Sequence, residues 1–145
     1  MIGLDRWVQF ITARLDEDEQ AARAALRADV CCWEHERLGG HDRLIEMYTY
    51  ADGTEDSDVI AFFGADGLAE HTARHDPSRA LREVEARRRT LARHTGKHVC
   101  PESPDEWHRY EGGERVDYMI PCADLRDLAG LWADHPDHPE RTDES

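Results

Sequence analysis

Four side chains that can bind a metal ion lie in the segment from residue 94 to residue 122: His94, His98, Cys100 and Cys122. Two imidazole nitrogens and two thiolate sulfurs are a donor set that zinc accepts in a tetrahedron. Because this segment is poor in apolar residues, a bound metal would add folding free energy there. We therefore predict a zinc site from these four residues. The alternative left open is that the cysteines are small buried residues and the histidines are surface groups.

Other histidine pairs are weaker candidates for a metal site. His71 and His75 are one helical turn apart, but the sequence HTARH lacks the glutamate that acts as base in zinc proteases. If the segment between Cys122 and His135 is helical, its ends are about 20 Å apart, so the two residues would not share a metal. His135 and His138, in the sequence HPDHP, could form a weak surface site by themselves, but the favoured interpretation is that they are tail residues. The sequence has no GxSxG elbow and no Gly-rich phosphate loop, so it indicates no known reaction.

The helix that must position His94 is the best-marked element of the chain. Asp76 can accept hydrogen bonds from the free amides of a first turn, and Pro77 suits the first helical position. Apolar residues then recur at helical spacing until Gly96, a natural stop. A shorter helix is predicted just before it, from residue 66. Cys122 follows Pro121 at the start of a last helix, where the helix dipole favours a thiolate.

The sequence patterns in the rest of the chain predict one long helix and a small antiparallel meander. Residues 4–28 carry an apolar stripe at helical spacing that needs a partner, and the Ala80–Ala92 stripe is the expected one. Residues 30–33, 44–50 and 59–63 have strand character and are separated by turn signals. The apolar run at 59–63 suits a strand that is buried on both faces or paired centrally. Residues 116–120 can add a short strand.

The predicted fold class is α+β, with two long helices and a shorter C-terminal helix packed with the meander. At 145 residues the chain fits one domain, which we place at residues 1–133. The polar residues 134–145 are expected to form a mobile acidic tail. The chain has no apolar run of the length that a membrane helix needs and no signal peptide pattern at its N-terminus, so a cytoplasmic location is expected. The four cysteines are then expected to be thiols or metal ligands.

The charge distribution bears on the class of partner. The formal net charge of -14 argues against direct nucleic-acid binding, because phosphate repulsion would oppose it. One segment is basic, however, and defines a candidate partner-binding face. The arginines of this face are Arg79, Arg82, Arg87, Arg88, Arg89 and Arg93. The alternative left open is a solvated helix face whose arginines pair with acidic groups of the same molecule.

Three blocks of the sequence resemble one known family. They are LDEDEQAARAA in the first helix, DGLAEHTARHDPSRALREVEARRR in the centre and CADLRDLAGLWADHPDH near the end. Their order and spacing are similar to those of a family of small actinobacterial and actinophage proteins, domain-of-unknown-function family 6221. The resemblance implies a bacterial or phage cytoplasmic protein and carries no assigned activity.

These observations favour a non-enzymatic module that binds a macromolecular partner, a protein in the first instance, and that carries a structural zinc ion. One alternative is a metal-dependent enzyme with an open position on zinc between His94, His98, Cys100 and Cys122. Another is an acidic mimic of nucleic acid that occupies a basic groove on a host or phage protein. The sequence leaves open whether the chain forms a homodimer.

Overall fold

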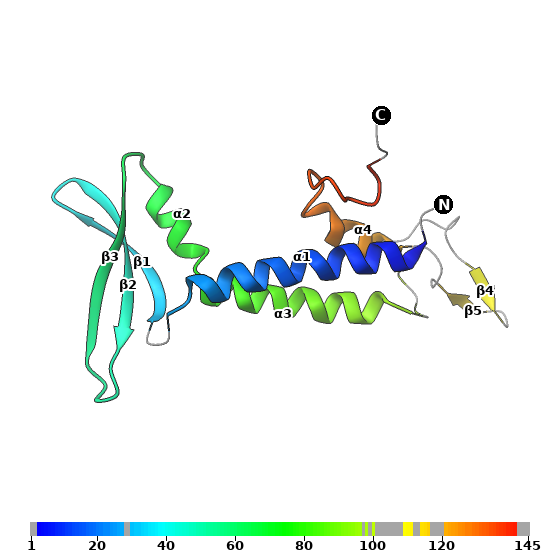
Figure 1. The fold of residues 1–145 in the computed structure, drawn as a ribbon, viewed down its shortest axis with the longest axis horizontal. Helices are drawn as coiled ribbons and strands as arrows, with labels where there is room; N and C mark the ends of the chain where they lie inside the picture. Colours follow the sequence, from blue (N-terminus) through cyan, green and yellow to red (C-terminus); the bar gives the residue numbers. More distant parts are fainter. Residues whose placement is uncertain are drawn as a thin grey trace. The chain divides into compact units, whose positions relative to one another are not determined.

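The computed structural model describes residues 3–27, 30–96, 98, 100, 109–111, 114–116 and 121–141, and it is an α+β structure (Figure 1). Its helices are α1 (Leu4–Ala25), α2 (Leu68–Arg74), α3 (Pro77–His94) and α4 (Ala123–Gly130). Its strands are β1 (Val30–Leu38), β2 (His41–Thr49), β3 (Glu55–Phe63), β4 (Arg109–Glu111) and β5 (Glu114–Val116). The predicted α+β class and the antiparallel meander are confirmed.

The chain divides into two compact units, and the boundary falls inside both α1 and α3. One unit, called the helical unit here, consists of Met1–Glu17 and Val84–Ser145. The other, the sheet unit, consists of Asp18–Glu83. The expectation of a single domain over residues 1–133 stays a prediction.

The helical unit has a core built from α1, α3 and α4, and the first two lie side by side within it (Figure 1). Ile11 and Leu15 of α1 share this core with Val84 and Leu91 of α3. Apolar residues of α1 and α3 therefore belong to one core in this unit. The C-terminal helix adds Leu125, Leu128 and Ala129. Cys100 and Cys122 belong to the same core, and each is almost completely buried.

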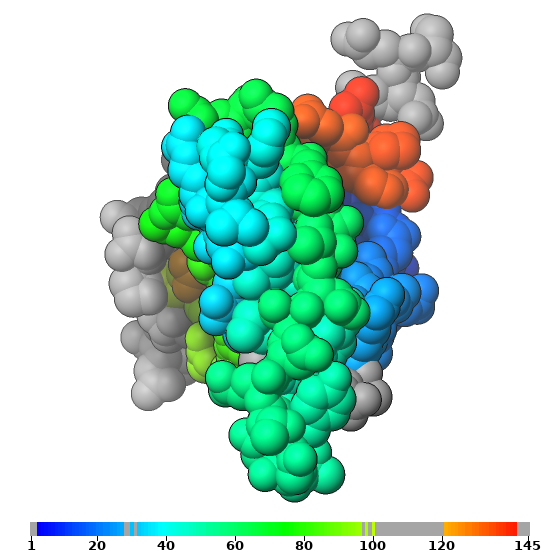
Figure 2. Space-filling view, turned by 90° about the vertical axis from the view of Figure 1, so that its left-hand side faces the viewer, coloured from blue at the N-terminus to red at the C-terminus, as the bar shows by residue number. Residues whose placement is uncertain are grey.

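The sheet unit is a three-stranded antiparallel sheet in the order β1-β2-β3, with α2 packed against β1 and β2. Gly39 and Gly40 form the β1–β2 turn with φ values of 62° and 83°, a conformation that glycine adopts without strain. The central strand β2 carries the buried residues Leu44 and Ile45. In Figure 2 the strands of this sheet form much of the visible surface, and the β2–β3 turn protrudes at the bottom.

The prediction that residues 59–63 form a strand that is central in the sheet or buried on both faces is wrong. They lie on β3, which is an edge strand, and Phe62 is 71% exposed. An apolar run gives no information on strand order, and here the central place is taken by β2. The predicted strand at residues 116–120 is described only at Val116, which ends β5 and pairs with Arg109 of β4; residues 117–120 lie outside the described residues.

The segment after α4 is described as far as residue 141, and the expected mobility of residues 134–145 stays a prediction. Residues 134–141 form turns, and His138 is only 6% exposed. The ring of His138 meets the rings of Trp7 and Phe10 edge to face, at centroid distances of 5.8 and 5.3 Å. Aromatic residues of α1 therefore contact this segment within the helical unit. The sequence carries no signal for such a long-range contact.

Candidate metal centre

The helix break before α3 forms as predicted and sets the start of the helix that carries His94. The carboxylate of Asp76 accepts a hydrogen bond from the backbone N–H of Arg79 at 2.7 Å, and Pro77 is the first helical residue. The helix then ends at His94, two residues before Gly96, which has a φ of 120°. His94 therefore lies on the last turn of α3, next to the chain reversal that returns His98 and Cys100 to the same region.

Three of the four predicted ligands converge in the helical unit. The donor atoms of His94, Cys100 and Cys122 all lie within 4.8 Å of one another. The Nδ1 atom of His94 is 3.4 Å from Sγ of Cys122. Zinc at ordinary bond lengths holds tetrahedral nitrogen and sulfur ligands about 3.5–3.8 Å apart. The three side chains therefore stand close to a zinc-binding arrangement and would need shifts of only about an ångström to reach it.

The other ring nitrogen of His94 has the partner that a zinc ligand usually has. Its Nε2 atom is 3.0 Å from a carboxylate oxygen of Asp124, on the first turn of α4. A carboxylate on the far nitrogen of a metal-bound histidine fixes the ring orientation and makes the ligating nitrogen more basic. Asp124 thereby leaves Nδ1 as the lone-pair nitrogen that faces the two sulfurs.

His98 is close to this group but is not part of it. Its ring centroid is 4.9 Å from that of His94, and the rings are nearly perpendicular. Its Nδ1 atom is 2.7 Å from the carbonyl oxygen of Gly96, to which it can donate. Its Nε2 atom is buried and has no hydrogen-bond partner among the described residues. A buried nitrogen on the ring next to His94 is the group that a fourth coordination bond would use.

In the metal-free protein, burial shifts the pKa values of His94 and Cys122. Burial lowers the pKa of His94, although the nearby Asp124 carboxylate acts in the opposite direction. Burial also raises the pKa of Cys122 to about 11, with a smaller contribution from Cys100. At the start of α4 a backbone hydrogen bond from Leu125 lowers the pKa of Cys122, in the direction predicted, but desolvation outweighs it in the metal-free protein. A divalent cation would reverse this balance, since it coordinates the thiolate.

The remaining sequence candidates are not brought to this site. His71 and His75 lie on and just after α2 in the sheet unit, with their rings 4.6 Å apart. Cys32 is a half-buried residue on β1, and the side chain of Cys31 lies outside the described residues. His135 contacts Arg14 instead of a cysteine.

At least three arginines of the α3 face pair with carboxylates of the same molecule. Arg79 and Arg89 pair with glutamates one turn away on α3, Glu83 and Glu85, each at 2.8 Å. Arg88 contacts Asp16 of α1 at 2.6 Å. Exposed pairs of this kind stabilise a protein by at most about 1 kcal/mol. Partner binding by this face stays a prediction.

Two functional candidates were missed from the sequence. Asp124 has no pattern that distinguishes it from the many other carboxylates of the chain. Arg14 lies three residues after Ile11 on the apolar stripe of α1 and is only 8% exposed. A buried arginine on a helical apolar stripe is the signal that could have identified it, because such a charge needs partners inside the fold.

Residues 4–141 match the family described as "Family of unknown function (DUF6221)". The chain belongs to this family. The match extends across the metal-ligand group and both units, so the resemblance seen in the three sequence blocks is confirmed for the family itself. No curated protein and no solved structure matches the chain. No helix among the described residues is both long and apolar enough to cross a membrane.

Proposed function

We propose that this DUF6221 protein is a small non-enzymatic binding module whose helical unit is stabilised by a structural zinc ion. The observation that carries the proposal is the convergence of His94, Cys100 and Cys122 within 4.8 Å in a buried core. Thiolate and imidazole ligands together favour zinc over magnesium or calcium, which prefer oxygen. The ion would link the end of α3 to the start of α4.

The burial of the donors favours a structural role over a catalytic one. Cys100 is 0% exposed and Cys122 is 1% exposed, so a metal between them would be removed from solvent. Catalytic zinc keeps one position open for water or substrate. The Nε2 atom of His98, which is buried and has no partner in the described part of the chain, supports a fourth protein ligand, which would close that position. An enzyme with an open zinc site remains the second candidate, and it requires His98 to stay unbound.

The binding role is supported by the charge distribution of the chain. A net charge of -14 makes a protein partner the preferred class and makes direct nucleic-acid binding unfavourable. An acidic mimic of nucleic acid ranks lower, because the basic stretch on α3 lies among the acidic segments. The family membership supports a bacterial or phage protein that acts in the cytoplasm, and this part of the proposal rests on the resemblance alone.

The test is the zinc content of the untagged full-length protein, measured by elemental mass spectrometry. We expect about one zinc ion per chain in the natural protein and almost none in Cys100→Ser or Cys122→Ser, with a lower melting temperature in both. Cys32→Ser is the matched control, since this thiol lies in the sheet unit, and it should keep its zinc.

Three outcomes would count against the structural site. Natural protein purified without chelators and found free of metal would remove the zinc proposal. Equal loss of zinc in the Cys32→Ser variant would indicate nonspecific binding by thiols. Retention of zinc with hydrolytic activity that depends on it would favour the open-site enzyme instead.

A further inference from the structure

A second polar cluster lies in the helical unit, between α1 and the segment that follows α4. The cluster surrounds a pocket of about 360 Å³. Its polar lining residues are Arg6, Gln9, Arg14, Asp137 and Arg141, and Phe10 and Pro136 add apolar surface. None of these residues belongs to the metal-ligand group. The pocket is within the size range of small-ligand sites, which start at about 300 Å³.

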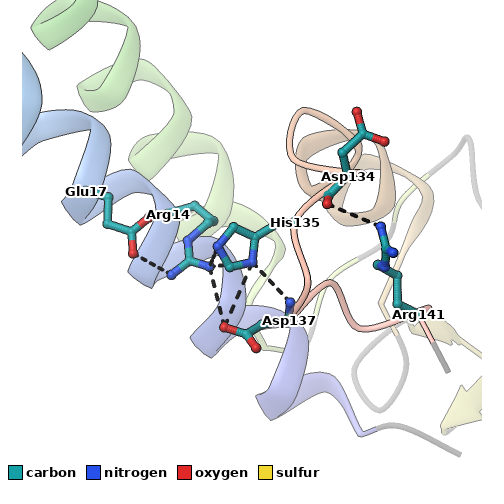
Figure 3. Close-up of polar contacts among 6 residues, drawn as sticks. All are labelled: Arg14, Glu17, Asp134, His135, Asp137 and Arg141. Atoms are coloured by element: carbon teal, nitrogen blue, oxygen red, sulfur yellow. Dashed lines mark hydrogen bonds and ion pairs between the residues drawn. The ribbon is translucent and has the colours of Figure 1, made fainter. Parts of the chain in front are cut away.

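The buried residue of this cluster is Arg14, whose guanidinium is held in place from two sides (Figure 3). One terminal nitrogen donates to the Glu17 carboxylate at 2.6 Å, and the other is 2.8 Å from Nδ1 of His135. The side chain is 9% exposed, and its Nε atom is buried without a hydrogen-bond partner among the described residues. A guanidinium that is already oriented loses little conformational entropy when it binds an anion.

The charge of the pocket is positive on a strongly acidic protein. Among its lining residues, three arginines face one carboxylate, that of Asp137. No carboxylate among the described residues forms an ion pair with Arg6 or Arg141; the guanidinium of Arg141 donates to the backbone carbonyl oxygen of Asp134 at 3.2 Å. Two cations are therefore not neutralised within the described part of the chain. Glu17 compensates part of the Arg14 charge from outside the pocket.

Asp137 marks the position that an anion would take. Its carboxylate lies 3.9 Å from the Arg14 guanidinium, too far for a hydrogen bond, and its side chain is 78% exposed (Figure 3). A loose, solvated contact of this kind contributes little to stability, so it costs little to displace. A ligand with several acceptor oxygens would gain shorter charge-assisted hydrogen bonds from the same arginine.

We propose that this pocket binds the phosphate group of a small phosphorylated molecule, with Arg6, Arg14 and Arg141 as its charge partners. The lining residues carry an excess of two positive charges, part of which Glu17 offsets from outside the pocket, and the charge that remains favours an anion such as a phosphate monoester, which carries about -1.5 to -2 charges near neutral pH. Exposed Pro136 and the small accessible part of Phe10, a side chain that is 6% exposed, supply apolar surface for the organic part of the ligand. The proposal goes beyond the zinc module and depends on none of its ligands.

The test is calorimetric titration of the full-length protein with phenyl phosphate, with benzoate as the singly charged carboxylate of similar shape. We expect phenyl phosphate to bind at least about tenfold more tightly than benzoate, because two charges and three oxygens match the arginines. In the double variant Arg6→Gln/Arg141→Gln its affinity should fall at least about tenfold. Both side chains are exposed, so this variant should fold.

The matched control is Arg23→Gln/Arg89→Gln, which removes two exposed, ion-paired arginines elsewhere and changes the net charge equally. It should bind phenyl phosphate as the natural protein does. Asp137→Asn should bind severalfold more tightly, because it removes the one lining carboxylate. Absence of binding at millimolar phenyl phosphate, or unchanged binding in the Arg6→Gln/Arg141→Gln variant, would overturn the proposal. Inorganic phosphate binding as tightly as phenyl phosphate would exclude a role for Phe10 and leave an inorganic anion as the ligand.

Discussion

The Nδ1 atom of His94 lies 3.4 Å from Sγ of Cys122, although 28 residues separate the two in the sequence. The contact joins the last turn of α3 to the residue that precedes α4. Because the other nitrogen of the same ring faces Asp124, one imidazole connects a carboxylate to a pair of buried thiols. The metal proposal therefore predicts effects of substitutions at residues that are not themselves ligands.

The first prediction concerns Asp124. Asp124→Asn removes the negative charge behind His94, so we expect zinc affinity to fall about 10- to 100-fold, a smaller loss than Cys122→Ser would cause. Competition with a chromophoric chelator measures this change directly. Asp127→Asn is the control. Asp127 is exposed on the same short helix, and its substitution removes the same charge. Equal effects of the two substitutions would show that Asp124 acts only through its charge and not through its contact with His94.

The second prediction concerns the fourth ligand. If the buried Nε2 atom of His98 completes the site, cobalt-substituted protein should show the absorption bands of a four-coordinate centre with two sulfur ligands. His98→Ala should change these bands as water replaces the imidazole, whereas His75→Ala in the sheet unit should leave them unchanged. Identical spectra for the natural protein and His98→Ala would exclude His98 as a ligand.

Local sequence signals predicted the elements that carry the site. The Asp76-Pro77 start of α3 and the Gly96 stop depend on backbone chemistry within a few residues, and both appear in the structure. The residue types of His94, Cys100 and Cys122 were sufficient to propose that they meet, because few other donors flank these helices. In these cases the physical cause is local or compositional.

Properties that depend on long-range environment could not be predicted in the same way. The raised pKa of the Cys122 thiol follows from its burial in a core that α1, α3 and α4 build together. The edge position of β3 follows from strand order, and the contacts of His138 follow from a return of the chain to α1. None of these leaves a periodic or spacing signal in one sequence.

The third prediction is a pH profile of the metal-free protein. Burial lowers the pKa of His94, so below about pH 6.5 the unfolded chain takes up a proton that the folded state resists, and stability falls with decreasing pH. Burial raises the pKa of Cys122 from 9.0 to about 11, so between these values the unfolded chain loses a proton first and stability falls with increasing pH. Urea denaturation in the presence of a chelator should therefore show a maximum between the two ranges.

Two comparisons isolate these groups from the other titrating residues. Cys122→Ser should lack its share of the alkaline loss of stability, because it has no thiol to ionise. Zinc-loaded natural protein should also lack it, since the metal already holds the thiolate. An alkaline slope that is the same in all three samples would show that Cys122 does not control it.

The last prediction tests the core that supports the site. Ile11 is completely buried in the same cluster as Cys100, Cys122 and Leu125. Ile11→Ala removes buried methyl groups and leaves a cavity, so we expect the free energy of unfolding to fall by about 2–5 kcal/mol. Leu131→Ala, at a side chain that is 54% exposed, should change it by less than about 0.5 kcal/mol. If zinc ties α3 to α4 independently of this core, Ile11→Ala should still bind the metal at full stoichiometry while it unfolds at a lower urea concentration. Loss of zinc together with stability would instead show that packing around Ile11, and not the ligands alone, holds the donors in place.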